Sequence, residues 1–309
     1  MVPLFNEEAV LPALLERLSQ VADNPDFEVE VMLVDDGSTD GTAYLLHKEL
    51  SGRTGFSAIS LSRNFGHAAA ITAGLQELLS HPDAVFIMDG DLQDPPELLG
   101  TFVEKMEEGF DVVYGIRKNR KEGFLKMMAY KAYYRLLKRF SNVHTPLDAG
   151  DFALLSGKVV SILNQMPEES RYLRGMRSWV GFKQIGIPYS RDGRADGNSK
   201  YSWRMLFRLA FNGLFNFSEF PIRFIGFVGM ISVLISLGYL ALTLYKKLAY
   251  GTVPAGFTAL IFAIVLFAGV QLLALGIIGE YVLRIFFQVK KRPLYIVRSR
   301  IVKGEFIDG

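Results

Sequence analysis

The chain has 309 residues, of which 50% are hydrophobic and 13% aromatic, and its formal net charge is only +2. This length is enough for one large domain or two modest ones. It contains no cysteine, which excludes disulfide bonds and thiolate metal sites. Acidic residues are concentrated in the first third, whereas lysine and arginine dominate after Arg117, so the second part favours an anionic partner.

Short apolar runs alternate with amphipathic stretches up to about Leu155. The runs at 29–36, 56–64, 84–91 and 111–117 read as strands, and the stretches at 7–21, 42–50, 68–79 and 95–108 read as helices. This alternation predicts a Rossmann-like α/β fold with a mostly parallel sheet covered on both faces. Ligands of such sheets bind beyond the C-terminal ends of the strands.

The strand ends carry most of the candidate chemistry. Asp89 and Asp91 follow an apolar run on the same face of a strand, which suits a divalent cation with positions open for phosphate oxygens. Gln93 adds a neutral oxygen, while Asp94 and Glu97 favour the end of the strand and the next helix N-terminus. A solvated acidic loop is the alternative interpretation.

Other strand ends carry similar polar residues. Asp35 and Asp36 precede a glycine-containing turn, and Arg63, Asn64 and Gly66 precede a helix N-terminus, where anions are favoured. His67 follows them, and a single histidine in such a position is more often structural than catalytic. Each of these strand ends is also compatible with an ordinary strand-to-helix connection.

Two long segments lack charge altogether, from Phe224 to Tyr245 and from Leu248 to Gly279. Each is long enough to cross a bilayer as a helix, with a loop over 246–255 between them. A pair of buried core helices is the alternative. Residues 203–221 combine aromatic side chains with a few arginines, a pattern that predicts an amphipathic helix in the membrane interface. A core helix of the soluble domain is the alternative.

Basic residues flank the outer ends of these two segments more heavily than the loop between them. The bias predicts an integral protein of the inner or plasma membrane, with its N-terminal domain and C-terminus in the cytosol. The expected domains are therefore an α/β domain over 1–202, the interfacial helix over 203–221, two membrane helices over 222–289 and a basic cytosolic tail over 290–309.

Four motifs follow one another along the chain: P-x-F-N-E-E, V-D-D-G-S-T-D-G-T, S-R-N-F-G-H and D-G-D-L-Q-D-P-P-E. Together they resemble the GT-A glycosyltransferases of family 2, and the polyprenyl-phosphate branch fits best. That branch includes dolichyl-phosphate mannose synthase and the bactoprenol glucosyltransferases. The later segments DAGDFALLSGKVV, ESRYLRGMRSWVGF and RADGNSKYSW agree with it, so the resemblance covers essentially the whole chain.

The resemblance implies a role for each matching residue. The nucleotide sugar would contact Pro3, Phe5, Glu7, Asp35, Asn64, Gly66, Asp89, Arg194, Ser199 and Lys200. The metal ligands would be Asp89, Asp91 and Gln93, and the acceptor phosphate would be bound by Arg117, Arg120 and Arg139. Surface charge for lipid headgroups is the alternative reading of Arg120. The residues expected in catalysis are Asp151, Asp91 and Arg117.

Asp151 leaves more than one role open. The corresponding acid is the base in many members of the family, but a lipid phosphate is already an anion and needs no strong base. Catalysis would then depend on positioning and electrostatics, with Asp151 orienting the acceptor or holding a turn. The segment RGMRSW replaces the Gln-x-x-Arg-Trp motif of processive relatives and favours a single transfer.

The resemblance thus implies an inverting, metal-dependent hexosyltransferase that uses Mg²⁺ or Mn²⁺ in cell-envelope glycosylation. Its expected reaction moves glucose from UDP-glucose to undecaprenyl phosphate. The alternatives are GDP-mannose with dolichyl phosphate, a UDP-linked amino sugar donor or, in another class, a transporter or scaffold for lipid-linked sugars. The expected partners are the nucleotide sugar, the polyprenyl phosphate, the membrane and other copies in a homo-oligomer such as a tetramer, but not nucleic acid.

Overall fold

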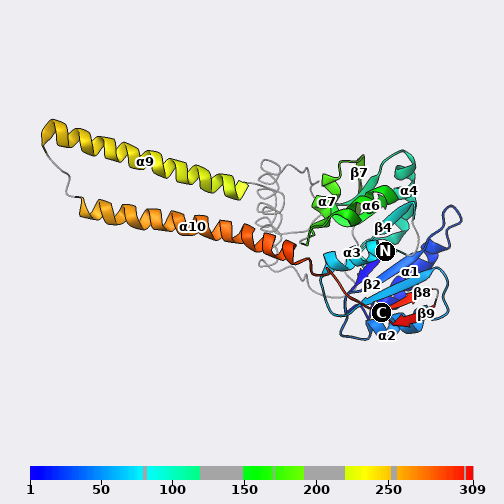
Figure 1. Ribbon diagram of the computed structural model, residues 1–309. Helices are drawn as coiled ribbons and strands as arrows, with labels where there is room; N and C mark the ends of the chain where they lie inside the picture. Colours follow the sequence, from blue (N-terminus) through cyan, green and yellow to red (C-terminus); the bar gives the residue numbers. More distant parts are fainter. Residues whose placement is uncertain are drawn as a thin grey trace. The chain divides into compact units, whose positions relative to one another are not determined.

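The structure, a computed structural model, describes residues 1–78, 82–118, 149–169, 171–190, 220–251, 256–302 and 304–308. It divides into two units. The first unit contains the α/β part of the chain and the segment from Arg292 onward, and the second contains two long helices (Figure 1).

Three parallel strands open the first unit. They are β1 (Val2–Leu4), β2 (Val31–Asp35) and β3 (Phe56–Leu61), with β2 in the middle. The helices after them are α1 (Leu11–Ala22), α2 (Thr42–Leu50) and α3 (His67–Gln76). In α1, leucines recur at helical spacing and are buried, so this face of the helix packs into the core: Leu11, Leu14, Leu15 and Leu18.

Four further strands form a second set, ordered β4-β6-β5-β7. Its strands are β4 (Ala84–Ile87), β5 (Val112–Lys118), β6 (Ala149–Ser156) and β7 (Gln184–Ser190). The helical elements beside them are η1 (Pro96–Leu98), α4 (Leu99–Glu107), α6 (Gly157–Gln165) and α7 (Leu173–Trp179). Three aromatic rings, Phe86, Phe102 and Phe152, pack against one another in the core beneath these strands.

Backbone hydrogen bonds connect the two sets of strands between β1 and β4. The Met1 nitrogen donates to the Phe86 carbonyl at 2.8 Å, and the Met88 amide donates to the Met1 carbonyl at 3.3 Å. This is the pattern of a parallel pair. Strand β4 therefore runs in the direction of β1, and its carboxyl end lies at the same edge of the sheet.

The predicted α/β fold is confirmed, but the strand pairing is mixed rather than mostly parallel, and one reversal of direction occurs where the sequence pattern does not show it. Strand β6 is antiparallel to both β4 and β5, which makes β5 parallel to β4. Because of this reversal, β6 begins at the edge where β4 and β5 end. Ile87 is opposite Ala153, and continuing that register brings Asp151 next to Asp89.

The C-terminal segment extends the sheet, although we expected residues 290–309 to form a basic tail. Strand β8 (Val297–Val302) pairs antiparallel with β3, and β9 (Glu305–Asp308) pairs with β8 beside the N-terminal strands (Figure 1). Arg298 and Arg300 lie on one face of β8, and Val297 and Ile301 lie on the other, a separation that the basic composition conceals. Arg300 also donates to the Glu77 carboxylate at 2.8 Å, which fixes the segment to the end of α3.

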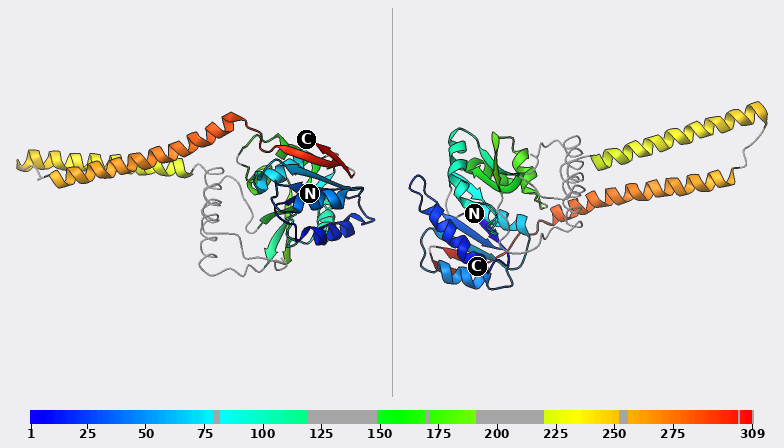
Figure 2. Two further views of the ribbon diagram at one scale, coloured as in Figure 1. Left: turned by 90° about the horizontal axis from the view of Figure 1, so that it is seen from below. Right: turned by 180° about the vertical axis from the view of Figure 1, so that it is seen from behind.

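The second unit consists of α9 (Phe220–Tyr250) and α10 (Phe257–Lys290), which lie side by side in Figures 1 and 2. Segments of 27 and 25 residues in them, with mean hydropathy 2.2 and 1.8, are long and apolar enough to cross a membrane. Helix α9 extends over Lys246 and Lys247, which we expected in the loop, and it ends before Gly251, whose φ of 63° favours glycine. The expected interfacial helix lies outside the described residues except for its last two positions, which begin α9.

A glycine closes the turn after β2 against the backbone that follows β3. Gly37 has φ of +65°, and a Cβ there would lie 2.3 Å from the Arg63 carbonyl carbon, whereas Gly55 has φ of +81° with no atom within 4 Å of that position. We expect Gly37→Ala to lower the free energy of unfolding by about 3 kcal/mol, because strain and overlap add, and Gly55→Ala by only about 1 kcal/mol. Urea unfolding followed by intrinsic fluorescence measures both losses, and equal losses would contradict this account.

Candidate active site

Three residues with predicted catalytic or metal roles come together at the edge where β4 and β5 end and β6 begins. Asp89 follows β4, Arg117 is near the end of β5, and Asp151 is near the start of β6. The Arg117 Nη2 atom lies 3.8 Å from Asp89 Oδ2. The edge position of these residues follows from the strand directions, and their mutual contact follows from the insertion of β6.

Asp151 forms a bidentate ion pair in this site. Both of its carboxylate oxygens accept hydrogen bonds from Arg174 of α7, from Nε at 3.0 Å and from Nη2 at 3.0 Å. Burial would raise the pKa of Asp151, but Arg174 and His67 hold that pKa well below its ordinary value. The carboxylate therefore stays ionised, which makes Asp151 a weak base.

His67 lies between the two carboxylates, a position that the sequence does not reveal. Its Nε2 atom is 3.4 Å from Asp151 Oδ2 and 3.7 Å from Asp89 Oδ1. Partial burial lowers the pKa of His67, but Asp151 and Asp89 outweigh it and raise that pKa overall. The available signal was its position, directly after a strand end and at the first residue of α3.

The predicted metal ligands lie in the turn after β4. Burial and the neighbouring carboxylates raise the pKa of Asp89, so a bound cation would stabilise its ionised form. The backbone N–H of Gln93 donates to Asp91 Oδ1 at 3.2 Å across this turn. Among the residues described, no group of three His, Cys, Asp or Glu side chains is placed to hold a metal by itself. Two carboxylates and an amide oxygen nevertheless fit a hard divalent cation that takes further oxygens from a diphosphate.

Asp94 has a different environment from the one the sequence predicts. Asp94 follows the strand as expected, but it is fully buried and accepts a hydrogen bond from the Tyr189 hydroxyl. The same hydroxyl accepts a hydrogen bond from Arg117 Nε at 3.3 Å. Glu97 lies in the first turn of η1 as expected, and its carboxylate also accepts hydrogen bonds from Arg17.

Most of the described residues predicted to hold the nucleotide lie within or shortly after β1, β2 and β3. Pro3 is buried, whereas Phe5 is 39% exposed and open to a flat ligand. Asp35 Oδ1 accepts a hydrogen bond from the Ser38 amide at 3.0 Å, and the Glu7 amide donates to Thr42 Oγ1 at 2.9 Å. Their nucleotide-binding roles remain predictions.

Asp36, to which no role was assigned from the sequence, positions the backbone that follows β3. Its two carboxylate oxygens accept the Phe65 amide at 2.7 Å and the Gly66 amide at 2.9 Å. These bonds hold the segment after β3, which includes Asn64, against the end of β2. The remaining predicted residues lie outside the described part of the chain: Arg120, Arg139, Arg194, Ser199 and Lys200.

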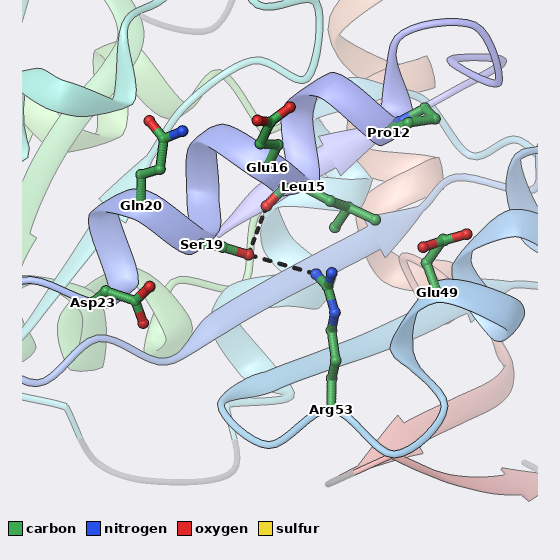
Figure 3. A pocket seen from close by; sticks show the side chains of 8 residues that line it. All are labelled: Pro12, Leu15, Glu16, Ser19, Gln20, Asp23, Glu49 and Arg53. Carbon is green, nitrogen blue, oxygen red and sulfur yellow. Dashed lines mark hydrogen bonds between the residues drawn. The ribbon is translucent and has the colours of Figure 1, made fainter.

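A pocket of about 310 Å³ lies elsewhere in the first unit, between α1 and the end of α2 (Figure 3). Arg53 extends toward Ser19 in this view, and its Nη1 atom donates to Ser19 Oγ at 3.5 Å. None of the residues predicted for catalysis, metal or nucleotide lines this pocket. We therefore assign the chemistry to the sheet edge rather than to this pocket.

Comparison with known proteins gives a consistent result. The family model described as Glycosyl transferase family 2 matches residues 1–162. The chain is 38% identical over 300 residues to the uncharacterized glycosyltransferase YkcC of Bacillus subtilis, covering 97% of this chain and 92% of the relative. It is 33% identical over 301 residues to the bactoprenol glucosyl transferase of Shigella phage SfX, covering 97% and 98%.

Similar solved structures include glucosyl-3-phosphoglycerate synthase from Mycobacterium tuberculosis in complex with Mn²⁺, UDP-glucose and phosphoglyceric acid. The identity is 17% and the TM-score 0.46, over 69% of this chain and 76% of that one. The family match covers more than half of the chain, and the curated relatives cover nearly all of it. The protein therefore belongs to glycosyl transferase family 2 and is a glycosyltransferase.

Proposed function

We propose that the protein transfers a single glucose from UDP-glucose to undecaprenyl phosphate, with inversion, at the cytosolic face of a membrane. Relatives named bactoprenol glucosyl transferase, 33% and 34% identical over nearly the whole chain, support this acceptor class and this sugar. The two long apolar helices support attachment to the membrane that contains the lipid. The basic residues that follow α10 support a cytosolic first unit.

The environment of Asp151 is the observation that carries the proposal. A sugar hydroxyl needs a base to become a nucleophile, and a carboxylate with a depressed pKa serves poorly as one. A phosphate monoester is already ionised at neutral pH. The bidentate Asp151–Arg174 pair therefore suits a phosphate acceptor better than a hydroxyl acceptor.

The reaction then requires no proton transfer. An acceptor phosphate oxygen forms a bond to the anomeric carbon, the bond from that carbon to the diphosphate oxygen breaks, and UDP leaves with the electron pair. Arg117 attracts the acceptor phosphate, and Asp94, Tyr189 and Asp89 raise the pKa of its guanidinium despite the opposing effect of burial. Asp35 and Glu7 hold the nucleoside on the other side of the site.

A divalent cation completes the site in this proposal. Asp89, Asp91 and Gln93 would hold it together with the donor diphosphate, and it would neutralise charge on the departing nucleotide. The raised pKa of Asp89 supports a cation at this position. Assembly into a homo-oligomer remains a prediction that cross-linking of the protein in its membrane tests.

A donor and acceptor screen tests the proposal. Purified protein in detergent is incubated with labelled UDP-glucose, UDP-N-acetylglucosamine or GDP-mannose, and with undecaprenyl or dolichyl phosphate. We expect labelled lipid from UDP-glucose and undecaprenyl phosphate with Mg²⁺ or Mn²⁺, and none after EDTA. Transfer from GDP-mannose alone would reassign the donor. No labelled lipid from any combination would contradict the proposal and favour the transporter or scaffold alternative.

A further inference from the structure

Tyr189 has a ring that packing holds in one orientation. It lies near the end of β7 and is only 5% exposed. The Phe152 ring lies against it with centroids 5.1 Å apart. From the neighbouring strand, a Cβ at Gly115 would lie 2.6 Å from Tyr189 Cε1, so glycine is needed there to make room for the ring. The direction of the hydroxyl is therefore fixed by the core.

The hydroxyl connects two charged residues. It donates to Asp94 Oδ1 and accepts from Arg117 Nε at 3.3 Å. Asp94 is 0% exposed, and a hydrogen bond to a buried carboxylate is worth more than one in water. Burial and Asp94 raise the pKa of Tyr189 above its ordinary value, so the phenol keeps its proton and remains a donor.

Arg117 is thereby held along one edge of its guanidinium. Its Nε atom is fixed at Tyr189, while Nη2 points toward Asp89, with 3.8 Å to Oδ2. A Cβ at Gly150 would lie 3.3 Å from Nη2, so β6 leaves space for this end of the group. A planar guanidinium held at Nε presents its other N–H groups in a defined direction.

We propose that Tyr189, anchored by Asp94, is a positioning residue that directs Arg117 toward the phosphate of the acceptor lipid. The inference rests on the proposed function, because it takes the ligand of Arg117 to be that phosphate. The inference goes further than the proposed function in one respect. It connects the turn after β4, which carries the predicted metal ligands, to the binding of the acceptor through the Tyr189 hydroxyl. A purely stabilising hydrogen bond would instead affect the folded state without discriminating between the two substrates.

Tyr189→Phe removes the hydroxyl and keeps the ring. We expect the KM for undecaprenyl phosphate to rise on the order of 10-fold, the size of effect typical for a lost hydrogen bond to a charged group, with the KM for UDP-glucose unchanged. Tyr295→Phe is the matched control, because the Tyr295 hydroxyl also donates to a carboxylate, Glu77, that Arg300 contacts. Tyr295 is not among the predicted site residues, so both KM values should stay at the wild-type level.

An Arg117→Lys background separates positioning from stability. If Tyr189 acts through Arg117, Tyr189→Phe should add little to the acceptor KM of Arg117→Lys, since the two changes remove the same interaction. If Tyr189→Phe does not fold, Asp94→Asn keeps an oxygen for the hydroxyl, removes the anchoring charge, and should raise the acceptor KM alone by a smaller factor.

The outcomes are distinguishable. An acceptor KM equal to wild type in both Tyr189→Phe and Asp94→Asn would overturn the inference and leave the proposed function intact. Equal increases in both KM values, or a lower melting temperature with unchanged KM values, would also overturn it. No transfer by the wild-type protein would overturn the proposed function and this inference with it.

Discussion

Asp91→Ala is expected to abolish sugar transfer, with kcat lower by about a thousandfold or more, while the protein remains folded. The residue lies in the turn directly after β4, where Asp91 Oδ1 accepts a hydrogen bond from the backbone N–H of Gln93 at 3.2 Å. The loss follows if Asp91 holds the cation that neutralises the departing diphosphate. The turn itself keeps Asp89 and the buried Asp94, so the fold should survive.

Asp83→Ala is the matched control for this prediction. Asp83 precedes the same strand at its opposite end and is exposed, so losing its carboxylate should leave kcat unchanged. Initial rates with saturating UDP-glucose and Mn²⁺ measure both variants, and near-ultraviolet circular dichroism verifies that they are folded. Transfer by Asp91→Ala at a rate near that of wild type would remove Asp91 from the metal site.

Arg174→Met is expected to lower the free energy of unfolding by about 3 kcal/mol and to reduce transfer strongly. The change removes both hydrogen bonds that Arg174 donates to Asp151, whose side chain is only 14% exposed. Arg17→Met is the matched control, because it also breaks a two-bond pair, with Glu97, but one whose side chains are 29% and 52% exposed. Such a surface pair contributes less than about 1 kcal/mol, so unfolding should be nearly unchanged.

At low pH, the difference in free energy of unfolding between wild type and Arg174→Met should become smaller. Because the pKa of Asp151 is depressed in the folded protein, its pair contributes stability that is fully present above the unfolded carboxyl pKa. That contribution is lost as the pH falls below about 4 toward the folded pKa. Urea midpoints of wild type and Arg174→Met should therefore converge on acidification. A gap between them that widened at low pH would contradict the assignment of the pair.

The strand-end carboxylates could be predicted from sequence because parallel strands end at one edge of a sheet. Asp35 and Asp89 each follow an apolar run, and the structure confirms that β2 and β4 share a direction. The contact between Asp151 and Asp89 could not be predicted. It depends on β6 running opposite to β4 and β5, and the run AGDFALLS carries no mark of its direction.

Other parts of the site depend on tertiary contacts between residues far apart in the chain. The sequence places His67 after a strand end but does not show which residue it contacts, because Asp151 is brought close to it only when the sheet has folded. Asp94 read as a helix-start residue because its local sequence, DPPE, has that signature, while Tyr189 contacts it from a distant strand. Strand β8 was obscured by its two arginines, although Val297 and Ile301 lie on the opposite face of the strand from them.

Analysis of the lipid product, by mass spectrometry for the number of added hexoses and by NMR for the anomeric configuration, tests the central claim most directly. Full-length protein is incubated with UDP-glucose, Mn²⁺ and undecaprenyl phosphate, with Asp91→Ala as the inactive reference. The account predicts one product, undecaprenyl phosphate with a single added hexose whose anomeric configuration is opposite to that in the donor. Absence of this lipid, a chain of several hexoses, or retention of the donor configuration would contradict it.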